Sequence, residues 1–333
     1  MTYSHTPQAA RAPLVRVTRK SPCPVCQKPD NCAVSADGRI AYCRRRPSGR
    51  RGRDGGWTHF LSGGPLPAAP ARPLREPSPR RDAAHCHGVY SVLLSSFGLT
   101  SEHREHLLVR RGLSEGAVSR NAYASMPAPG RAREACRELS HRFDLRGVPG
   151  FWLDSKDGAW KLSYCAAGIL VPVRDVEERI VALQLRRDHT PDGTDLRYVL
   201  LSSTHLEGGA NSSAPVHFRD VAAISQSGRA VITEGALKGD IISDRLGEGV
   251  IAISGVSSFR QGFGGELRRL LPSLRRADVC FDSDWRTNRH VKDAIFRLLR
   301  ELSSARVAAS VRTWPSRHKG FDDYLVEGRA ALA

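Results

Sequence analysis

The sequence contains no run of about 18 apolar residues, so it predicts no helix that could cross a bilayer. Residues 1–20, MTYSHTPQAARAPLVRVTRK, also lack the apolar core of a secretory signal. We therefore expect a cytoplasmic protein without a membrane partner, whose eight cysteines are metal ligands or buried thiols rather than disulfides. A GxxxxGKS or GxxxxGKT loop is absent too, so the sequence shows no P-loop for binding nucleoside triphosphates.

Acidic residues are scarce relative to basic ones. The 333 residues include 34 Asp and Glu against 51 Lys and Arg, which gives a formal charge of +17 at pH 7. Such an excess favours a polyanionic partner, either nucleic acid or an anionic membrane surface. Residues 1–82 hold sixteen basic and five acidic side chains, so the strongest attraction for a polyanion is expected toward the N-terminus.

Length and local composition predict several domains rather than one. The predicted segments are a basic flexible arm at 1–20, a metal-binding module at 21–61, a Pro-rich linker at 62–87, an α+β subdomain at 88–220 and an α/β domain at 221–333. Six prolines within residues 62–82, without apolar periodicity, are the basis for the linker.

Two different secondary-structure patterns follow the linker. In the α+β subdomain Thr100 and Ser114 are expected helix N-caps, and residues 176–178 are an expected hairpin turn. Strands are expected there at 168–175, 179–188 and 196–203. The last third alternates helical segments with apolar runs, which is typical of a mostly parallel sheet flanked by helices. Those runs are 230–235, 250–255, 277–284 and 306–314.

Four cysteines lie within a short, polar and basic segment that offers no core to bury them. Cys23, Cys26, Cys32 and Cys43 follow the spacing C-x₂-C-x₅-C-x₁₀-C, which suits tetrahedral Zn²⁺. His59 is a fifth candidate that could replace Cys32. Because four protein ligands leave no open position for water, we expect structural zinc in a small, zinc-ribbon-like module.

Arginines follow the last of these cysteines directly. Arg44, Arg45 and Arg46 would be fixed by metal binding against Trp57. Guanidinium groups bind phosphates and stack on bases or aromatic rings, so this array is a candidate nucleic-acid contact. The alternative interpretation is a solvated basic tail.

Carboxylates follow two of the expected parallel strands. Glu234 ends the run at 230–235 just before a helix expected at 236–246, and Asp282 and Asp284 end the run at 277–284. In an extended chain the i,i+2 spacing would turn both aspartates to one side. Three carboxylates at neighbouring strand ends would make an oxygen-rich site suited to Mg²⁺ and phosphoryl transfer.

At these residues the chain resembles the Toprim domain of bacterial primases, topoisomerases and some nucleases. Glu234-Gly235 resembles the family's glutamate motif, and Asp282-Ser283-Asp284 resembles its DxD motif. The segment 319–324, KGFDDY, is similar to the K-D-P-D-E-Y region of DnaG-type primases, with Gly320 in place of one Asp. The resemblance therefore implies Asp322 as the remaining accessory magnesium ligand.

The resemblance extends upstream of these motifs. Residues 168–187 are similar to the strand pair before Toprim in DnaG-type primases, and 197–203, RYVLLSS, resembles their KYLNSPE stretch. The Cys module comes first, as in that family. Its spacing, and Lys238 in ITEGALKGDI, are nearer to the short primase-like proteins of phages and mobile elements.

The resemblance implies a DNA primase-like nucleotidyltransferase that uses single-stranded DNA and nucleoside triphosphates to make short primers. Glu234 would act as general base or orient the attacking hydroxyl, and Asp282 and Asp284, with Glu234 beside them, would hold Mg²⁺. Because the P-loop is absent, strand unwinding would need a separate replicative helicase. A basic groove for template or nucleotide would be lined by Arg174, Arg186, Arg187, Arg197, Lys238 and Lys319. The alternatives are a Toprim nuclease and a non-catalytic, nucleic-acid-binding replication accessory.

Overall fold

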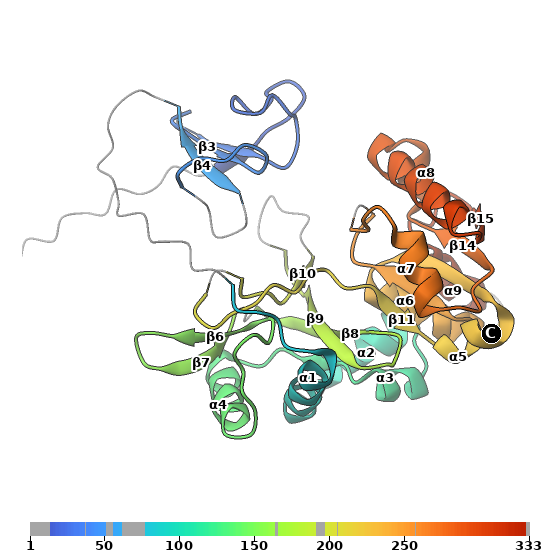
Figure 1. Ribbon diagram of the computed structural model, residues 1–333, viewed down its shortest axis with the longest axis horizontal. Helices are drawn as coiled ribbons and strands as arrows, with labels where there is room; N and C mark the ends of the chain where they lie inside the picture. Colours follow the sequence, from blue (N-terminus) through green and yellow to red (C-terminus); the bar gives the residue numbers. More distant parts are fainter. Residues whose placement is uncertain are drawn as a thin grey trace, which may run out of the picture. The chain divides into compact units, whose positions relative to one another are not determined.

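The computed structural model describes residues 14–36, 38–50, 56–61, 77–163, 166–190, 197–204, 206–256 and 258–330 (Figure 1). The chain divides into two compact units, Met1–Arg75 and Glu76–Ala333, which we call the small unit and the large unit. Each unit is described by itself below.

The small unit is an antiparallel sheet in the order β1-β2-β3-β4. Its strands are β1 (Leu14–Arg16), β2 (Ala33–Ser35), β3 (Ile40–Cys43) and β4 (Trp57–Phe60). Because Leu14–Arg16 pairs with β2, the prediction of a flexible arm at 1–20 is wrong for these residues, and 1–13 lie outside the described residues. Among its described residues Val17 and three cysteines form a buried apolar cluster, with Val25, Cys26 and Val34 packed against them, and Ala41 of β3 is buried too.

The large unit begins with helices and an antiparallel sheet. The helices are α1 (Ala83–Phe97), α2 (Ser101–Glu105), the π-helix η1 (His106–Arg110), α3 (Glu115–Asn121) and α4 (Pro129–Ser140). The strands are β5 (Ala124–Ser125), β6 (Phe151–Asp154), β7 (Ala159–Leu162), β8 (Gly168–Arg174), β9 (Ile180–Arg187) and β10 (Tyr198–Leu200). Thr100 and Ser114 accept hydrogen bonds from His103 N and Ala117 N, so both predicted N-caps are confirmed.

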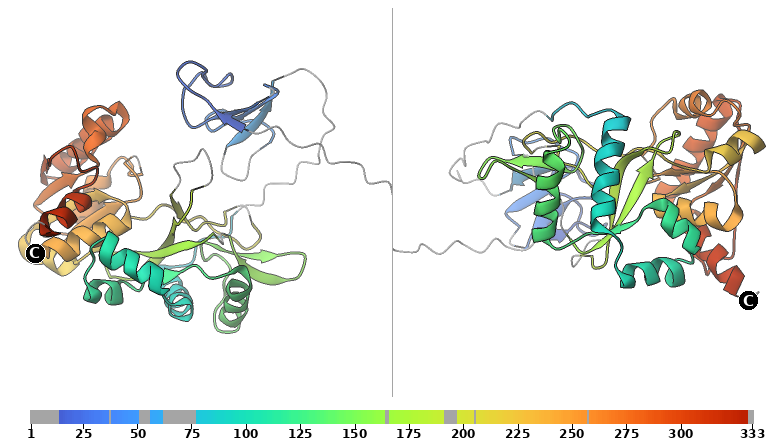
Figure 2. Two further views of the ribbon diagram at one scale, coloured as in Figure 1. Left: turned by 180° about the vertical axis from the view of Figure 1, so that it is seen from behind. Right: turned by 90° about the horizontal axis from the view of Figure 1, so that it is seen from below.

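The sheet β10-β9-β8-β5 is covered on both faces. Figure 2 shows α1 and α4 side by side, and their apolar side chains pack with Leu170, Leu183 and Leu185 in one core. The other face packs against helix α6 (Ala236–Leu246) of the following domain. Burial of both faces explains why the sequences of these strands are continuously apolar instead of alternating between apolar and polar residues.

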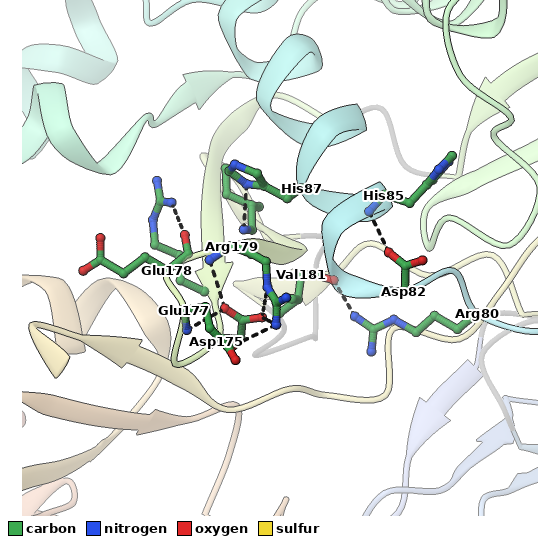
Figure 3. Close-up of polar contacts among 11 residues, drawn as sticks. Arg80, Asp82, His85, His87, Asp175, Glu177, Glu178, Arg179 and Val181 are labelled. Carbon is green, nitrogen blue, oxygen red and sulfur yellow. Dashed lines mark hydrogen bonds and ion pairs between the residues drawn. The ribbon is translucent and has the colours of Figure 1, made fainter. Parts of the chain in front are cut away.

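The turn between β8 and β9 is fixed by local polar contacts (Figure 3). The Asp175 carboxylate accepts hydrogen bonds from the Glu177 and Arg179 backbone N–H groups, at 3.0 and 2.9 Å. Glu178 adopts a left-handed conformation with φ of 61°. The hairpin turn predicted at 176–178 is therefore confirmed.

The chain just before α1 is already part of the large unit. The Arg80 guanidinium donates to the Val181 carbonyl, and Asp82 caps α1 through His85 N at 2.8 Å (Figure 3). The prediction of a linker at 62–87 is therefore too long at its C-terminal end. Residues 62–76 lie outside the described residues.

The last part of the large unit is a sheet in the order β11-β13-β12-β14-β15. Its elements are β11 (His217–Arg219), α5 (Val221–Ser227), β12 (Arg229–Glu234), β13 (Val250–Ile253), α7 (Phe263–Leu270), β14 (Arg276–Cys280), the 3₁₀ helix η2 (Ser283–Arg286), α8 (Arg289–Ser304), β15 (Ala308–Val311) and α9 (Phe321–Ala330). β13, β12, β14 and β15 are parallel, and β11 is antiparallel to β13. The predicted mostly parallel sheet with flanking helices is present.

Apolar side chains of α5, α7 and α8 cover one face of this sheet, and those of α6 and α9 pack on the other. Two details of the prediction are wrong. β11 precedes residue 221, so the boundary at 220/221 lies inside this domain. The strand expected at 277–284 ends at Cys280, and Asp284 lies in the following 3₁₀ helix because the chain turns there.

Candidate functional site

The four predicted zinc ligands lie together in the small unit. The Sγ atoms of Cys23, Cys26, Cys32 and Cys43 are all within 4.8 Å of one another. Cys26 Sγ and Cys32 Sγ are 3.7 Å apart. Zn–S bonds of about 2.3 Å in a tetrahedron place sulfur atoms about 3.8 Å apart, so this donor set fits Zn²⁺.

The electrostatics differ among the four thiols: burial raises the pKa of Cys23 and raises that of Cys32 to about 12, whereas the pKa of Cys26 is lowered. Burial opposes ionisation of Cys26, but the Lys28 backbone N–H and the neighbouring thiols outweigh it and lower the pKa of Cys26 to about 7. The backbone N–H groups of Arg45 and Arg46 point at Cys43 Sγ, at 3.4 and 3.3 Å. Such groups stabilise thiolates, which are the form that binds metal.

His59 lies outside the cysteine cluster. Its Nε2 is 3.0 Å from the Arg46 carbonyl oxygen. The geometry therefore favours Cys32 over His59 as the fourth ligand, and the histidine instead ties β4 to the chain that follows β3.

The three arginines after Cys43 do not form one array. Arg45 donates to both oxygens of Asp30 at 3.0 Å and approaches Cys32 Sγ at 3.8 Å, so it supports the cysteine cluster. Arg44 and Arg46 are exposed and available for an external anion. Trp57 is half-buried and lies opposite Cys43 in the sheet.

In the large unit the predicted carboxylates meet at one edge of the parallel sheet. β12 and β14 are neighbours, and Thr233 lies opposite Cys280. Glu234 and Asp282 follow these positions, so both leave the carboxyl ends of adjacent strands, where open α/β sheets bind ligands. Burial raises the pKa of Glu234, Lys238 opposes this, and the nearby charges of Asp282 and Asp284 add to it.

Lys238 lies among these carboxylates. It comes from the first turn of α6, and its ammonium group contacts Asp282 Oδ1. Lys319 Nζ lies 3.8 Å from Asp282 Oδ2 with its side chain 75% exposed. Among the described residues, the four cysteines are the only group of three or more His, Cys, Asp or Glu ligand atoms that close to within 4.8 Å. In the described part of the chain the carboxylates therefore share one edge without three of their oxygens closing to within 4.8 Å, and Lys238 contacts Asp282.

Two carboxylate oxygens at this edge are buried without a hydrogen-bond partner in the described part of the chain, Asp284 Oδ1 and Asp322 Oδ1. Asn288 Nδ2 donates to Asp284 Oδ2 at 3.2 Å, and Arg111 donates to Asp322 Oδ2 at 2.8 Å. A buried carboxylate oxygen without a donor is costly. Hard oxygen donors in such a state fit Mg²⁺.

Sequence reasoning missed Arg111. It follows η1 and reaches across 211 residues of sequence to Asp322, which is 1% exposed. Nothing local distinguishes it from the chain's many surface arginines. Its importance follows only from the fold, which joins the antiparallel domain to the acidic edge through this ion pair.

The remaining predicted basic residues are dispersed. Arg174 donates to the carbonyl oxygens of Glu178 and Asn121 at 2.8 and 3.3 Å, so it holds the hairpin. Arg187 is buried, and Arg197 is exposed. Arg186 is near His106, where burial first and then the charges of Arg186 and Arg111 lower the histidine pKa to about 4. Arg186 and Arg111 therefore both lie near His106, and the Arg186 guanidinium is also 4.0 Å from Asp188 Oδ1.

Several solved structures have a fold similar to that of this chain. The zinc-binding and RNA polymerase domains of the Aquifex aeolicus primase superpose with a TM-score of 0.59 and 13% identity over 76% of this chain. The fold resembles that of DnaG-type primases. This chain spans 60% of that solved chain.

Two further solved structures also have a fold similar to that of this chain. The RNA polymerase domain of Mycobacterium tuberculosis DnaG, solved with a double-stranded DNA oligomer bearing a 6-nucleotide overhang, gives a TM-score of 0.55 at 16% identity, over 75% of this chain and 79% of that one. A DnaG primase catalytic domain bound to single-stranded DNA gives 0.52 at 15% identity, over 75% and 77%. At these identities the likeness concerns the fold.

Sequence comparisons add less. Residues 224–331 match a family described as a domain of unknown function, DUF3854. None of the curated proteins matches this chain. Within the described residues, no helix has the length and apolarity to span a membrane.

Proposed function

We propose that this protein is a primase-like nucleotidyltransferase that binds single-stranded DNA and joins nucleoside triphosphates into short primers with Mg²⁺. The observation that carries the proposal is the gathering of Glu234, Asp282 and Asp284 at the ends of β12 and β14. This acidic edge lies in a fold similar to primase catalytic domains. We further infer that the parallel sheet and its helices are a Toprim domain and that the host replicon is a phage, plasmid or other mobile element.

The proposed roles follow from position. Glu234, Asp282 and Asp284 would hold the metal, with Asp322 beside them, and bound Mg²⁺ would neutralise the triphosphate charge. A primer 3′-hydroxyl oxygen forms a bond to the α-phosphorus while the bond to the bridging oxygen of the β-phosphate breaks, and pyrophosphate leaves. Glu234, half-buried at the end of β12, would accept the hydroxyl proton or orient the attacking hydroxyl.

Nucleic-acid binding would involve both units. In the small unit the exposed Arg44 and Arg46 are free of the contacts that occupy Arg45. In the large unit Arg186, Arg197 and Lys319 are the proposed contacts to template or nucleotide phosphates. Structural zinc would hold the small unit in shape, and unwinding would be left to a separate helicase.

The experiment that tests the proposal incubates zinc-loaded protein with single-stranded DNA, labelled ribonucleotides or deoxynucleotides, and Mg²⁺. Short labelled products are expected. Degradation of the template without products would instead indicate a nuclease, and binding without either would indicate a replication accessory.

The variants Glu234→Gln, Asp282→Asn and Asp284→Asn should each lower the rate by about 10²- to 10⁴-fold. Glu248→Gln is the matched control, because Glu248 is an exposed carboxylate of the same domain and should leave the rate unchanged. Full activity in all three acidic variants would remove the assigned roles.

A further inference from the structure

Helix α8 has a buried face and an outward face. Its buried side chains pack into the core of the parallel-sheet domain, and they are Val291, Ala294, Ile295, Leu298 and Leu302. Arg289, Lys292, Phe296 and Arg300 are spaced by three or four residues, so they lie together on the opposite face. All four are exposed, and Phe296 is 53% exposed. The outward face of α8, defined by these four residues, therefore presents an aromatic ring among three cations.

The cations of this outward face are poorly compensated by carboxylates. Arg289 has one acidic partner, Asp293, at 3.7 Å, and their side chains are 94% and 66% exposed. Such an exposed ion pair contributes little and is open to competition from another anion. In the part of the chain that the structure describes, Lys292 and Arg300 form no ion pair. The face therefore carries a surplus of positive charge.

The other carboxylate of α8 is used within the fold. Glu301 Oε2 accepts a hydrogen bond from the Gly262 N–H at 2.9 Å, so it caps the N-terminus of α7. A Cβ atom on Gly264 would come within 2.0 Å of the Glu301 carbonyl oxygen, so α7 and α8 pack closely there. The Arg297 guanidinium lies 4.5 Å from the centroid of the Phe259 ring. Glu301 and Arg297 thus contact α7 and the chain before it, and the outward face stays open.

Helix α4 offers a comparison within the same unit, and Figure 1 shows it at the opposite end of the large unit from α8. It also exposes three arginines, Arg131, Arg133 and Arg137. These are interspersed with two glutamates, and Arg131 contacts both, at 2.8 and 3.6 Å. No aromatic residue occurs in this helix. The outward face of α8 therefore differs from an ordinary charged helix surface in both its charge surplus and its exposed ring.

The chemistry of the outward face fits single-stranded nucleic acid. Arginine and lysine bind the phosphates, and an exposed ring is a surface on which bases stack. α8 also begins beside the acidic edge, because its N-cap Asn288 donates to Asp284 Oδ2 at 3.2 Å. An acidic protein segment would need only the cations. The exposed ring and the position beside the acidic edge favour nucleic acid.

We propose that the outward face of α8 is a nucleic-acid contact of its own, which binds a single strand beside the acidic edge. Arg289, Lys292 and Arg300 hold phosphates, and a base stacks on Phe296. The inference rests on the proposed function for the identity of the partner. It adds a surface separate from the basic residues proposed there.

The test measures the fluorescence anisotropy of a labelled single-stranded oligonucleotide bound to the full, zinc-loaded chain, without nucleoside triphosphates, over a range of salt concentrations. Arg289→Met, Lys292→Met and Arg300→Met together remove three phosphate contacts and should reduce the salt slope by about 2. Phe296→Leu keeps an apolar side chain without a ring. It should weaken binding about 5- to 100-fold at an unchanged slope.

The matched control changes the three exposed arginines of α4 together to Met and should leave the salt slope unchanged. Equal slopes for the α8 and α4 triple variants would overturn the inference, as would full affinity in Phe296→Leu. An α8 triple variant that loses binding of poly-glutamate but keeps the oligonucleotide slope would assign the face to an acidic protein segment instead. Primer synthesis is measured separately. A reduced slope without primers would support this surface and remove the proposed catalysis, whereas primers with an unchanged slope would do the reverse.

Discussion

The small unit and the large unit are held together by different means. Among the described residues of the small unit, the buried apolar positions are Val17, Ala41 and three cysteines of the cluster, Cys23, Cys32 and Cys43. The large unit has four apolar clusters among its described residues, which fill the space between its sheets and helices. We therefore expect the small unit to need a metal to fold, whereas burial of apolar surface stabilises the large unit.

The two units also differ in the chemistry of their proposed metal ligands. Soft thiolates enclose the small unit's site on all sides, which suits a permanent zinc ion. Hard carboxylates, with oxygens left open, line the edge of the large unit's sheet, which suits an exchangeable Mg²⁺. Loss of metal should therefore unfold the small unit and only inactivate the large unit.

The largest expected effect is the loss of zinc. A strong chelator, or Cys43→Ser, should remove about 10 kcal/mol of stabilisation from the small unit. Hydrogen–deuterium exchange should then show loss of protection in β2 to β4 and unchanged protection in β8, β9 and β12. Amide protection that survives in the metal-free small unit would show that this unit folds without zinc. Full zinc in Cys32→Ser together with loss in His59→Ala would show that the ligand set is wrong.

The next effect belongs to the large unit. Arg111→Met leaves the Asp322 carboxylate, 1% exposed, without its partner and should cost about 3 to 5 kcal/mol. Urea unfolding of the full chain measures this, with the exposed neighbour in Arg110→Met as the control. Adding Asp322→Asn should recover part of the loss. Equal stabilities of the two arginine variants would show that the ion pair is not structural.

A smaller effect is expected from the three arginines after Cys43, which should differ in their contribution to DNA binding and to zinc retention. Replacing Arg44 and Arg46 with Met removes two exposed phosphate contacts and should reduce the salt slope of single-strand binding by about 1.4. Arg45→Met should lower zinc retention instead, because Arg45 is occupied by Asp30 and the Cys32 thiolate. An unchanged slope in the double variant would place the binding surface elsewhere.

The smallest effect is a pH-dependent gain in stability. The raised pKa of Glu234 means that its charge destabilises the folded large unit above the ordinary glutamate pKa, and this cost disappears as the pH falls below that range. Glu234→Gln should therefore be slightly more stable than the unaltered protein at neutral pH and equally stable in acid. Thermal unfolding at both pH values measures it. A destabilised variant at neutral pH would show that Glu234 gains more from Lys238 than it loses by burial.

Features that depend on local sequence were predicted well. The hairpin at 176–178, the caps at Thr100 and Ser114, and helix α6 at Ala236–Leu246 appear where periodicity and turn chemistry place them. The C-x₂-C knuckle predicted a compact cluster because a tight turn brings two thiolates together. The parallel neighbours β12 and β14 also placed Glu234 near Asp282.

Other features were decided only by tertiary structure. The sequence could not show that the chain leaves β14 at Cys280, that Arg111 meets Asp322, or that Arg45 belongs to the cysteine cluster. The contacts of Arg111 and Arg45 join segments whose separation in sequence carries no periodic signal. They form because the folded sheets and helices leave a charged group buried, and a buried charge takes whichever partner the packing brings within reach. The sequence by itself thus determined the elements and the kinds of ligand, while the tertiary structure decided which charges meet.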